Sequence, residues 1–230
     1  MKGIGWLVMG ATAAAGAAEA SPWAQEAGGI YARATASAER LSGKDGWRGD
    51  LYGEYGLKGR WTLTGKAEAV RYDGGGVSDR DALRASLRRQ LWSSKSGWAL
   101  GAELGAVHGS AVAGVAGCDG WGGEARASVG RSGVYRDRSF YVFADAAHIA
   151  HEDGCTRNRF EAGYGADLSE HWFSEQQVWL EQGNQTADSA KLETRVGYHF
   201  KLADLSVGYR KEFGGDFTEQ AWLVSLTVRR

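Results

Sequence analysis

The chain has 230 residues, of which 24% are charged and 43% hydrophobic, and 27 basic against 28 acidic side chains give a net charge of −1. Such a balanced charge provides no general attraction to nucleic acid or to an acidic partner. No nucleic-acid motif, phosphate-binding glycine loop or zinc-ligand spacing occurs in the sequence. The mean hydropathy of −0.39 is too low for a bundle of transmembrane helices, and the length suits one domain.

The amino terminus has the pattern of a secretory signal peptide. Lys2 precedes an apolar run from Ile4 to Ala18, and Ala18 and Ala20 form an A-x-A cleavage site. A membrane anchor or buried helix is the alternative, but the run is short and rich in Ala and Gly. We therefore predict a signal peptide at 1–20, followed by a short periplasmic segment at 21–28 and one domain at 29–230.

The rest of the chain alternates apolar and polar side chains with a period of two, which is typical of β-strands. The alternation is clear in 46–58 and in 190–201, and the single proline, Pro22, precedes all of these segments. Proline cannot donate to a β-ladder, so its absence from the remainder favours continuous sheet. In chain order, the expected strands are 29–41, 46–58, 60–72, 80–92, 97–108, 121–132, 138–150, 157–168, 171–182, 189–201, 203–213 and 217–229.

Three of these segments have a weaker pattern. Residues 79–92 also fit a helix, because Leu83, Leu87 and Leu91 are four apart, but their parity equally fits a strand. The segment 140–150 is apolar on both parities, and 171–182 carries Gln176 among its apolar residues. For 79–92 the strand interpretation is preferred because of its context, and the other two segments are weaker strands.

The connections alternate in length: those after 58, 92, 132, 168 and 201 are short, and most of the others are longer and rich in Gly, Asp and Ser. Short periplasmic turns and longer external loops are typical of outer-membrane barrels. The sequence therefore predicts an all-β fold, a closed antiparallel up-and-down transmembrane β-barrel of about 12 strands. Over residues 29–230 the chain resembles bacterial outer-membrane β-barrel proteins as a broad class, without a motif that selects one family.

This resemblance implies a location in the bacterial outer membrane, with lipid and the outer-membrane assembly machinery as partners. Rings near the expected strand ends suit the headgroup layer. They are Trp61, Trp92, Trp98, Phe140, Trp172 and Phe200 at the periplasmic rim, and Trp47, Trp121 and Phe213 at the outer rim. The two cysteines, Cys118 and Cys155, fall in neighbouring external loops, and export favours a disulfide between them.

The polar parity of the strands is expected to face the lumen and carries charges of both signs. The predicted lumen-lining residues are Arg48, Asp50, Glu54, Lys66, Glu68, Arg84, Arg88, Glu103, Glu124, Arg126, Glu161, Lys191, Glu193, Arg195, Arg210 and Glu212. A barrel of about twelve strands has a backbone radius of roughly 12 Å, which leaves room for a narrow channel. Paired Arg and Glu side chains are equally able to close that space.

We expect a small passive channel or porin-like transporter for polar solutes. The alternatives are a structural or surface-interaction barrel with a salt-bridged lumen and, less favoured, a lipid-acting hydrolase. A hydrolase needs a Ser within reach of an oriented His, and no local motif marks one among the five histidines. His148 and His151 are three apart and so should point to opposite sides of a strand. No catalytic, metal-binding or cofactor-binding residue is predicted.

Overall fold

The computed structural model describes residues 22–73, 79–109, 118–185 and 188–230, so the predicted signal peptide lies outside the described residues. The described residues form twelve strands: β1 (Ile30–Leu41), β2 (Lys44–Leu57), β3 (Trp61–Tyr72), β4 (Arg80–Ser93), β5 (Trp98–Gly109), β6 (Trp121–Tyr135), β7 (Arg138–His151), β8 (Thr156–Asp167), β9 (Trp172–Gly183), β10 (Ser189–His199), β11 (Asp204–Gly215) and β12 (Glu219–Arg229). Within these ranges, no helix has the length and apolar character needed to span a membrane.

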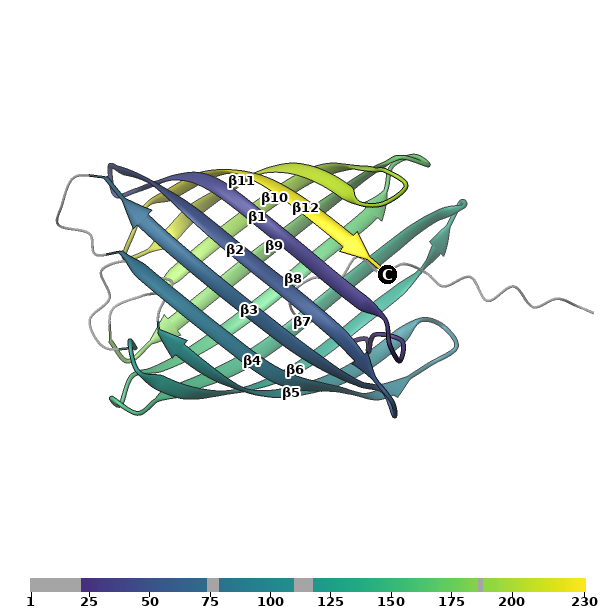
Figure 1. Ribbon diagram of the computed structural model, residues 1–230, viewed down its shortest axis with the longest axis horizontal. Helices are drawn as coiled ribbons and strands as arrows, with labels where there is room; N and C mark the ends of the chain where they lie inside the picture. Colours follow the sequence, from purple (N-terminus) through teal and green to yellow (C-terminus); the bar gives the residue numbers. More distant parts are fainter. Residues whose placement is uncertain (1–21, 74–78, 110–117, 186–187) are drawn as a thin grey trace, which may run out of the picture.

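The strands form a closed antiparallel barrel in which each strand pairs with its neighbours in the chain and β1 also pairs with β12 (Figure 1). At this seam, Ile30 and Arg230 exchange two backbone hydrogen bonds of 2.7 and 2.9 Å. A closed ring leaves no strand edge unpaired, and lipid offers the backbone no substitute partner. We call the end where β1 begins and β12 ends the terminal end, and the opposite end the loop end.

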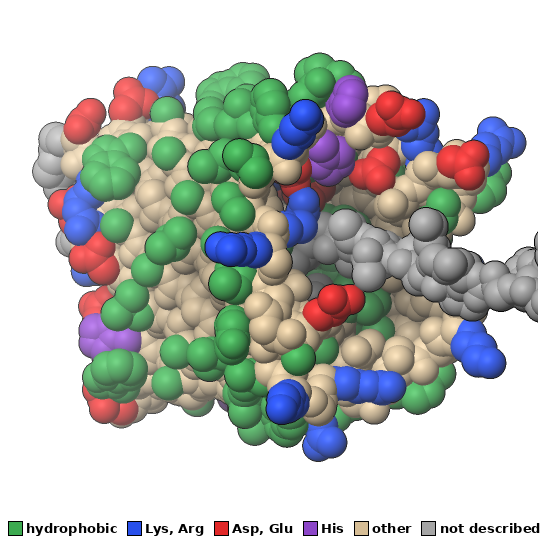
Figure 2. Space-filling view, turned by 45° about the vertical axis from the view of Figure 1, so that its right-hand side comes forward, with side chains coloured by type: hydrophobic (Ala, Val, Ile, Leu, Met, Phe, Trp, Pro, Cys, Tyr) green, Lys and Arg blue, Asp and Glu red, His purple; other side chains and the backbone are tan. Residues whose placement is uncertain are grey.

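Period-two alternation divides each strand between the interior and the outer wall. In β12, Ala221, Leu223 and Ser225 are buried, whereas Trp222 and Val224 between them are 70% and 51% exposed. Figure 2 shows hydrophobic side chains spread over the outer wall, and many charged side chains near its two ends. An apolar outer surface of this extent is what a barrel presents to lipid.

The predicted architecture is confirmed, and each strand boundary lies within about three residues of the expected one. The ambiguous segment 79–92 is strand β4, paired with β3 and β5. Its leucines Leu83, Leu87 and Leu91 face outward, and Arg84 and Arg88 face inward. The helix alternative for this segment is therefore wrong, because spacing by four also places residues on one face of a strand.

Aromatic side chains occupy the interior toward the terminal end, which the sequence analysis did not anticipate. Tyr31 packs edge-to-face against Tyr52 with ring centroids 6.1 Å apart, and Tyr141 stacks on Phe143 at 6.3 Å. Across the β7–β8 pair, Phe143 covers Gly163, where an added Cβ would lie 2.3 Å from the ring. Only glycine leaves the space for that ring.

The predicted disulfide between Cys118 and Cys155 is confirmed, with the two Cα atoms 5.3 Å apart. Cys118 lies before β6, and Cys155 lies in the β7–β8 connection at the loop end. One carboxylate holds both partners, because Asp153 accepts hydrogen bonds from the backbone N–H of Cys118 at 2.6 Å and of Cys155 at 2.9 Å. The bond ties the chain before β6 to the next connection at this end.

Replacing both cysteines with serine is expected to lower the free energy of unfolding, by at most roughly 4 kcal/mol on the chain-entropy estimate. Urea unfolding of the refolded protein in detergent, followed by tryptophan fluorescence, measures the change. Reductant should lower the midpoint of the unaltered protein and leave that of the double variant unchanged. Labelling of Cys118 and Cys155 by a thiol reagent in unreduced protein would contradict the expectation.

Candidate functional site

The sixteen residues predicted from the sequence to line the lumen all point into the barrel, where their side chains are buried or half-buried. They come from β2, β3, β4, β5, β6, β8, β10 and β11, and strand parity directs each of them inward. The interior therefore collects charges from almost the whole ring. The structure groups these charges into three networks, which lie at different heights and on different sides of the wall.

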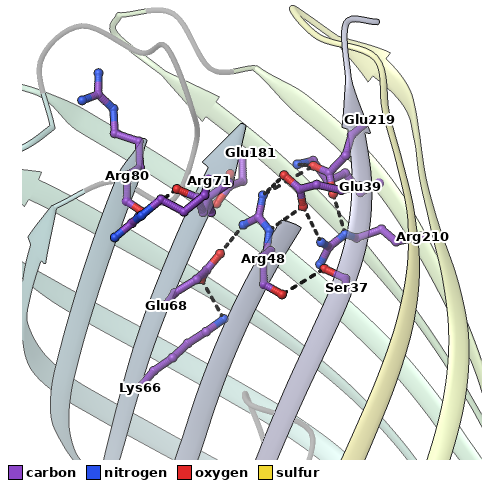
Figure 3. A network of polar contacts seen from close by, with 12 residues as sticks. Ser37, Glu39, Arg48, Lys66, Glu68, Arg71, Arg80, Glu181, Arg210 and Glu219 are labelled. Atoms are coloured by element: carbon purple, nitrogen blue, oxygen red, sulfur yellow. Dashed lines mark hydrogen bonds and ion pairs between the residues drawn. The ribbon is translucent and has the colours of Figure 1, made fainter. Parts of the chain in front are cut away.

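The first network lies toward the loop end and joins the two sides of the seam (Figure 3). Arg48 forms ion pairs with Glu39, at 2.8 Å, and with Glu68. Arg210 contacts Glu219 at 2.7 Å and Glu39 at 3.6 Å. Along these contacts, each guanidinium group lies between two carboxylates, which is the arrangement that compensates buried charges. The network joins β11, β12, β1, β2 and β3.

The second network crosses β4 to β8. Arg126 contacts Asp145 at 2.6 Å, Glu124 at 3.0 Å and Glu161 at 3.5 Å. Glu124 also contacts Arg84 at 3.4 Å. One guanidinium therefore serves three carboxylates, and its planar set of donors suits that task.

The third network lies toward the terminal end and is the most enclosed. Arg88 and Glu54 form an ion pair of 2.8 Å, with side chains 1% and 0% exposed. The hydroxyl of Tyr52 donates to Glu54 at 2.5 Å, and the amide of Gln25 donates to its other oxygen at 2.6 Å. On the neighbouring strands, Glu103 accepts hydrogen bonds from Thr64 and Ser86.

Two cavities lie among these networks in the interior. One of about 100 Å³ is bordered by eight basic side chains and four acidic ones. The other, of about 90 Å³, shares Lys66, Glu68, Arg157 and Arg159 with the first. Because the cavities share these walls, they adjoin each other toward the loop end, and we refer to the pair as the charged hollow region. Basic side chains therefore outnumber acidic ones along the wall of the larger cavity, and Glu39 and Glu219 pair with three of them from outside that wall.

A separate hollow of about 760 Å³ involves the outer wall. Its outward-facing lining includes Ala125, Ala127 and Ala146, which are smaller than the neighbouring Leu104, and also His148. It results from short side chains on β6 and β7, and it faces away from the barrel axis.

Several interior charges escaped the prediction of lumen-lining residues, among them Asp145, Arg157, Glu181 and Glu219. Asp145 lies in the segment that is apolar on both parities. The nearest residues on its own face of the strand are uncharged, so the sequence pattern did not identify that face as the inner one. Glu219 shares the inward parity of β12 with Ala221 and Leu223, which are apolar and yet buried inside the barrel. Parity carried through from the neighbouring strands identifies both residues as inward-facing.

The histidines are placed as follows. His148 is exposed on the outer wall and bonds Asn158 at 2.8 Å, and His151 is buried with its ring 3.1 Å from the carbonyl of Gly120. His199 lies between Asp204, at 2.8 Å, and Asp167, at 3.4 Å. In the described part of the chain, no hydrogen bond joins a histidine ring to a serine hydroxyl, and no group of three potential metal ligands occurs.

No protein-family model and no curated protein matches the chain. Among solved structures, the NanC porin is similar with a TM-score of 0.62 and 8% identity, over 85% of this chain and 98% of that one. The KdgM porin is similar at 0.61 and 9%, over 85% and 98%. An outer membrane channel from Pseudomonas putida F1 is similar at 0.56 and 12%, over 90% and 97%. At such identities the likeness shows the fold, which is that of bacterial outer-membrane β-barrels.

Proposed function

We propose that the protein is a porin-like channel for small polar solutes in the bacterial outer membrane. The observation that carries the proposal is the charged hollow region inside a closed barrel whose outer wall is apolar. An apolar wall fits lipid as its surrounding, and a charged hollow fits water and polar solutes as its contents. Insertion by the outer-membrane assembly machinery is part of the same proposal.

Anions are the preferred solutes in this proposal. The basic side chains that border the larger cavity outnumber the acidic ones by eight to four, although the whole chain carries a net charge of −1. A positive potential between low-dielectric walls raises the local concentration of anions. The KdgM porin, which has a similar fold, has been solved in complex with disordered oligogalacturonate, so acidic saccharides are one class of solute to test.

Planar bilayers containing the purified, folded protein test this function. We expect discrete conductance steps and, under a gradient of potassium chloride, a reversal potential of the sign that chloride permeability produces. A reversal potential of the opposite sign would contradict the anion preference alone. Folded protein that gives no conductance at any voltage would contradict the channel and leave a structural barrel closed by its ion pairs.

A further inference from the structure

Before β1, residues 22–25 are buried or half-buried, and Glu26, Ala27 and Gly28 are exposed. These residues belong to the stretch 21–28 that the sequence predicts as a periplasmic segment. Pro22 is among the fully buried residues. Trp23 packs edge-to-face against Tyr141, with ring centroids 6.5 Å apart, and so joins the Tyr141–Phe143 cluster. An unattached lead-in would be exposed and would lack such contacts.

Three glycines of the interior wall lie where this segment passes. A Cβ added to Gly130 of β6 would lie 2.6 Å from the Trp23 ring, and one added to Gly101 of β5 would lie 3.0 Å from the Cα atom of Pro22. A Cβ added to Gly56 of β2 would lie 1.7 Å from the carbonyl oxygen of Glu26. Three strands thus carry glycine at the point of closest approach, which is where a close backbone contact requires it.

Hydrogen bonds hold the other part of the segment to β2 and β3. The backbone N–H of Gln25 donates to Thr62 at 3.0 Å, and its side-chain amide donates to Glu54 at 2.6 Å. The N–H of Gly28 donates to the carbonyl of Gly56 at 2.8 Å. Gln25 therefore contacts both β2 and β3, and it binds the carboxylate of the most enclosed ion pair of the interior.

The two sets of contacts lie on different parts of the ring. Gln25 is held by β2 and β3, whereas Trp23 contacts β6 and β7, and β4 and β5 lie between these pairs in the sheet order. A short segment that is anchored to both pairs spans a chord of the interior and fills part of its cross-section. The contacts cluster toward the terminal end, away from the charged hollow region.

We propose that residues 22–25 form a built-in constriction toward the terminal end and set the size limit for solutes. This inference rests on the proposed channel function and adds the element that determines its selectivity for size. The anchors are Trp23 at one side and Gln25 at the other. The charged hollow region and the constriction then act in series, the first on the charge of a solute and the second on its size.

The test compares four forms of the refolded chain in planar bilayers: unaltered protein, Trp23→Ala with Gln25→Ala, deletion of 22–25, and Glu26→Gln. Glu26 is exposed, directly follows the constriction in the chain, and serves as the matched control. Conductance is measured with polyethylene glycols of increasing size, which report the solute size that enters. Heat-modifiable electrophoretic mobility verifies that each form is folded.

We expect the deletion to raise conductance at least about twofold and to admit larger polymers, because the narrowest cross-section of a pore limits its conductance. The double substitution should shift both quantities in the same direction, and Glu26→Gln should leave them unchanged. Conduction by the deletion form alone would support a constriction that closes the lumen. Equal conductance and polymer limits in all folded forms would overturn the constriction while retaining the channel, and absence of conductance in all of them would overturn both.

Discussion

Replacing Arg88 with methionine is expected to lower the free energy of unfolding by about 3–5 kcal/mol, the range typical of removing one partner from a buried ion pair. Arg88 is 1% exposed and pairs with Glu54, which has no exposed surface. The variant leaves the Glu54 carboxylate buried with only its hydrogen bonds from Tyr52 and Gln25. The midpoint of urea unfolding in detergent, read by tryptophan fluorescence, measures the loss.

Two further variants make this expectation specific. Adding Glu54→Gln to Arg88→Met removes the stranded charge, so the double variant should be more stable than Arg88→Met alone. Arg40→Gln breaks the exposed pair with Asp45, whose side chains are 62% and 61% exposed, and should leave the midpoint unchanged. An Arg88→Met midpoint equal to that of Arg40→Gln would contradict the importance assigned to the buried pair.

Removing two basic side chains from the larger cavity, by Lys191→Gln with Arg159→Gln, is expected to lower the ratio of anion to cation permeability. A unit charge about 7 Å from an ion in water shifts its energy by about 0.6 kcal/mol, or about threefold in occupancy. The substitutions strand no carboxylate, because Glu219 keeps Arg210 at 2.7 Å and Glu181 keeps Arg157 at 3.0 Å. The reversal potential under a salt gradient measures the ratio.

The matched control for this pair is Lys95→Gln with Arg131→Gln. Both residues are exposed and lie toward the terminal end, so the control removes the same charge without touching the cavities. Its reversal potential should equal that of the unaltered protein. If the cavity variant and the control shift the potential equally, the selectivity comes from the total charge of the protein and the cavities do not determine it.

The fold could be predicted from the sequence because alternate residues of a strand in a barrel wall face the outside and the interior, and the residue types alternate accordingly. In β2, Leu51 and Tyr55 face outward while Arg48 and Glu54 face inward, and the letters alternate accordingly. The signal weakens where the interior is itself apolar. Tyr141 and Phe143 of β7 point inward beside Asp145, so both parities of that strand are apolar and the pattern does not separate them.

The candidate site was accessible in part. Parity assigned Arg48, Arg126 and Glu161 to the interior, but the partners that they meet depend on how the ring closes and staggers. The contact between Arg210 and Glu39 joins β11 to β1 across the seam. The alternation within either strand does not predict it. The position of Trp23 inside the barrel was also inaccessible, because the segment before β1 has no alternation and its glycine-lined surroundings come from β5 and β6.

The seam between β1 and β12 has a consequence for biogenesis. Thr35 meets Ser225, a partner 190 residues further along the chain, through a hydroxyl contact of 3.0 Å. The first strand can therefore pair with the last one only after the last one has been synthesised. The loop-closure entropy over so long a separation opposes spontaneous pairing of the two strands. Until then β1 and the growing edge both present unsatisfied backbone groups, which attract other strands. Closure of the seam is therefore the step that removes the last two edges at which the nascent protein can pair with other chains.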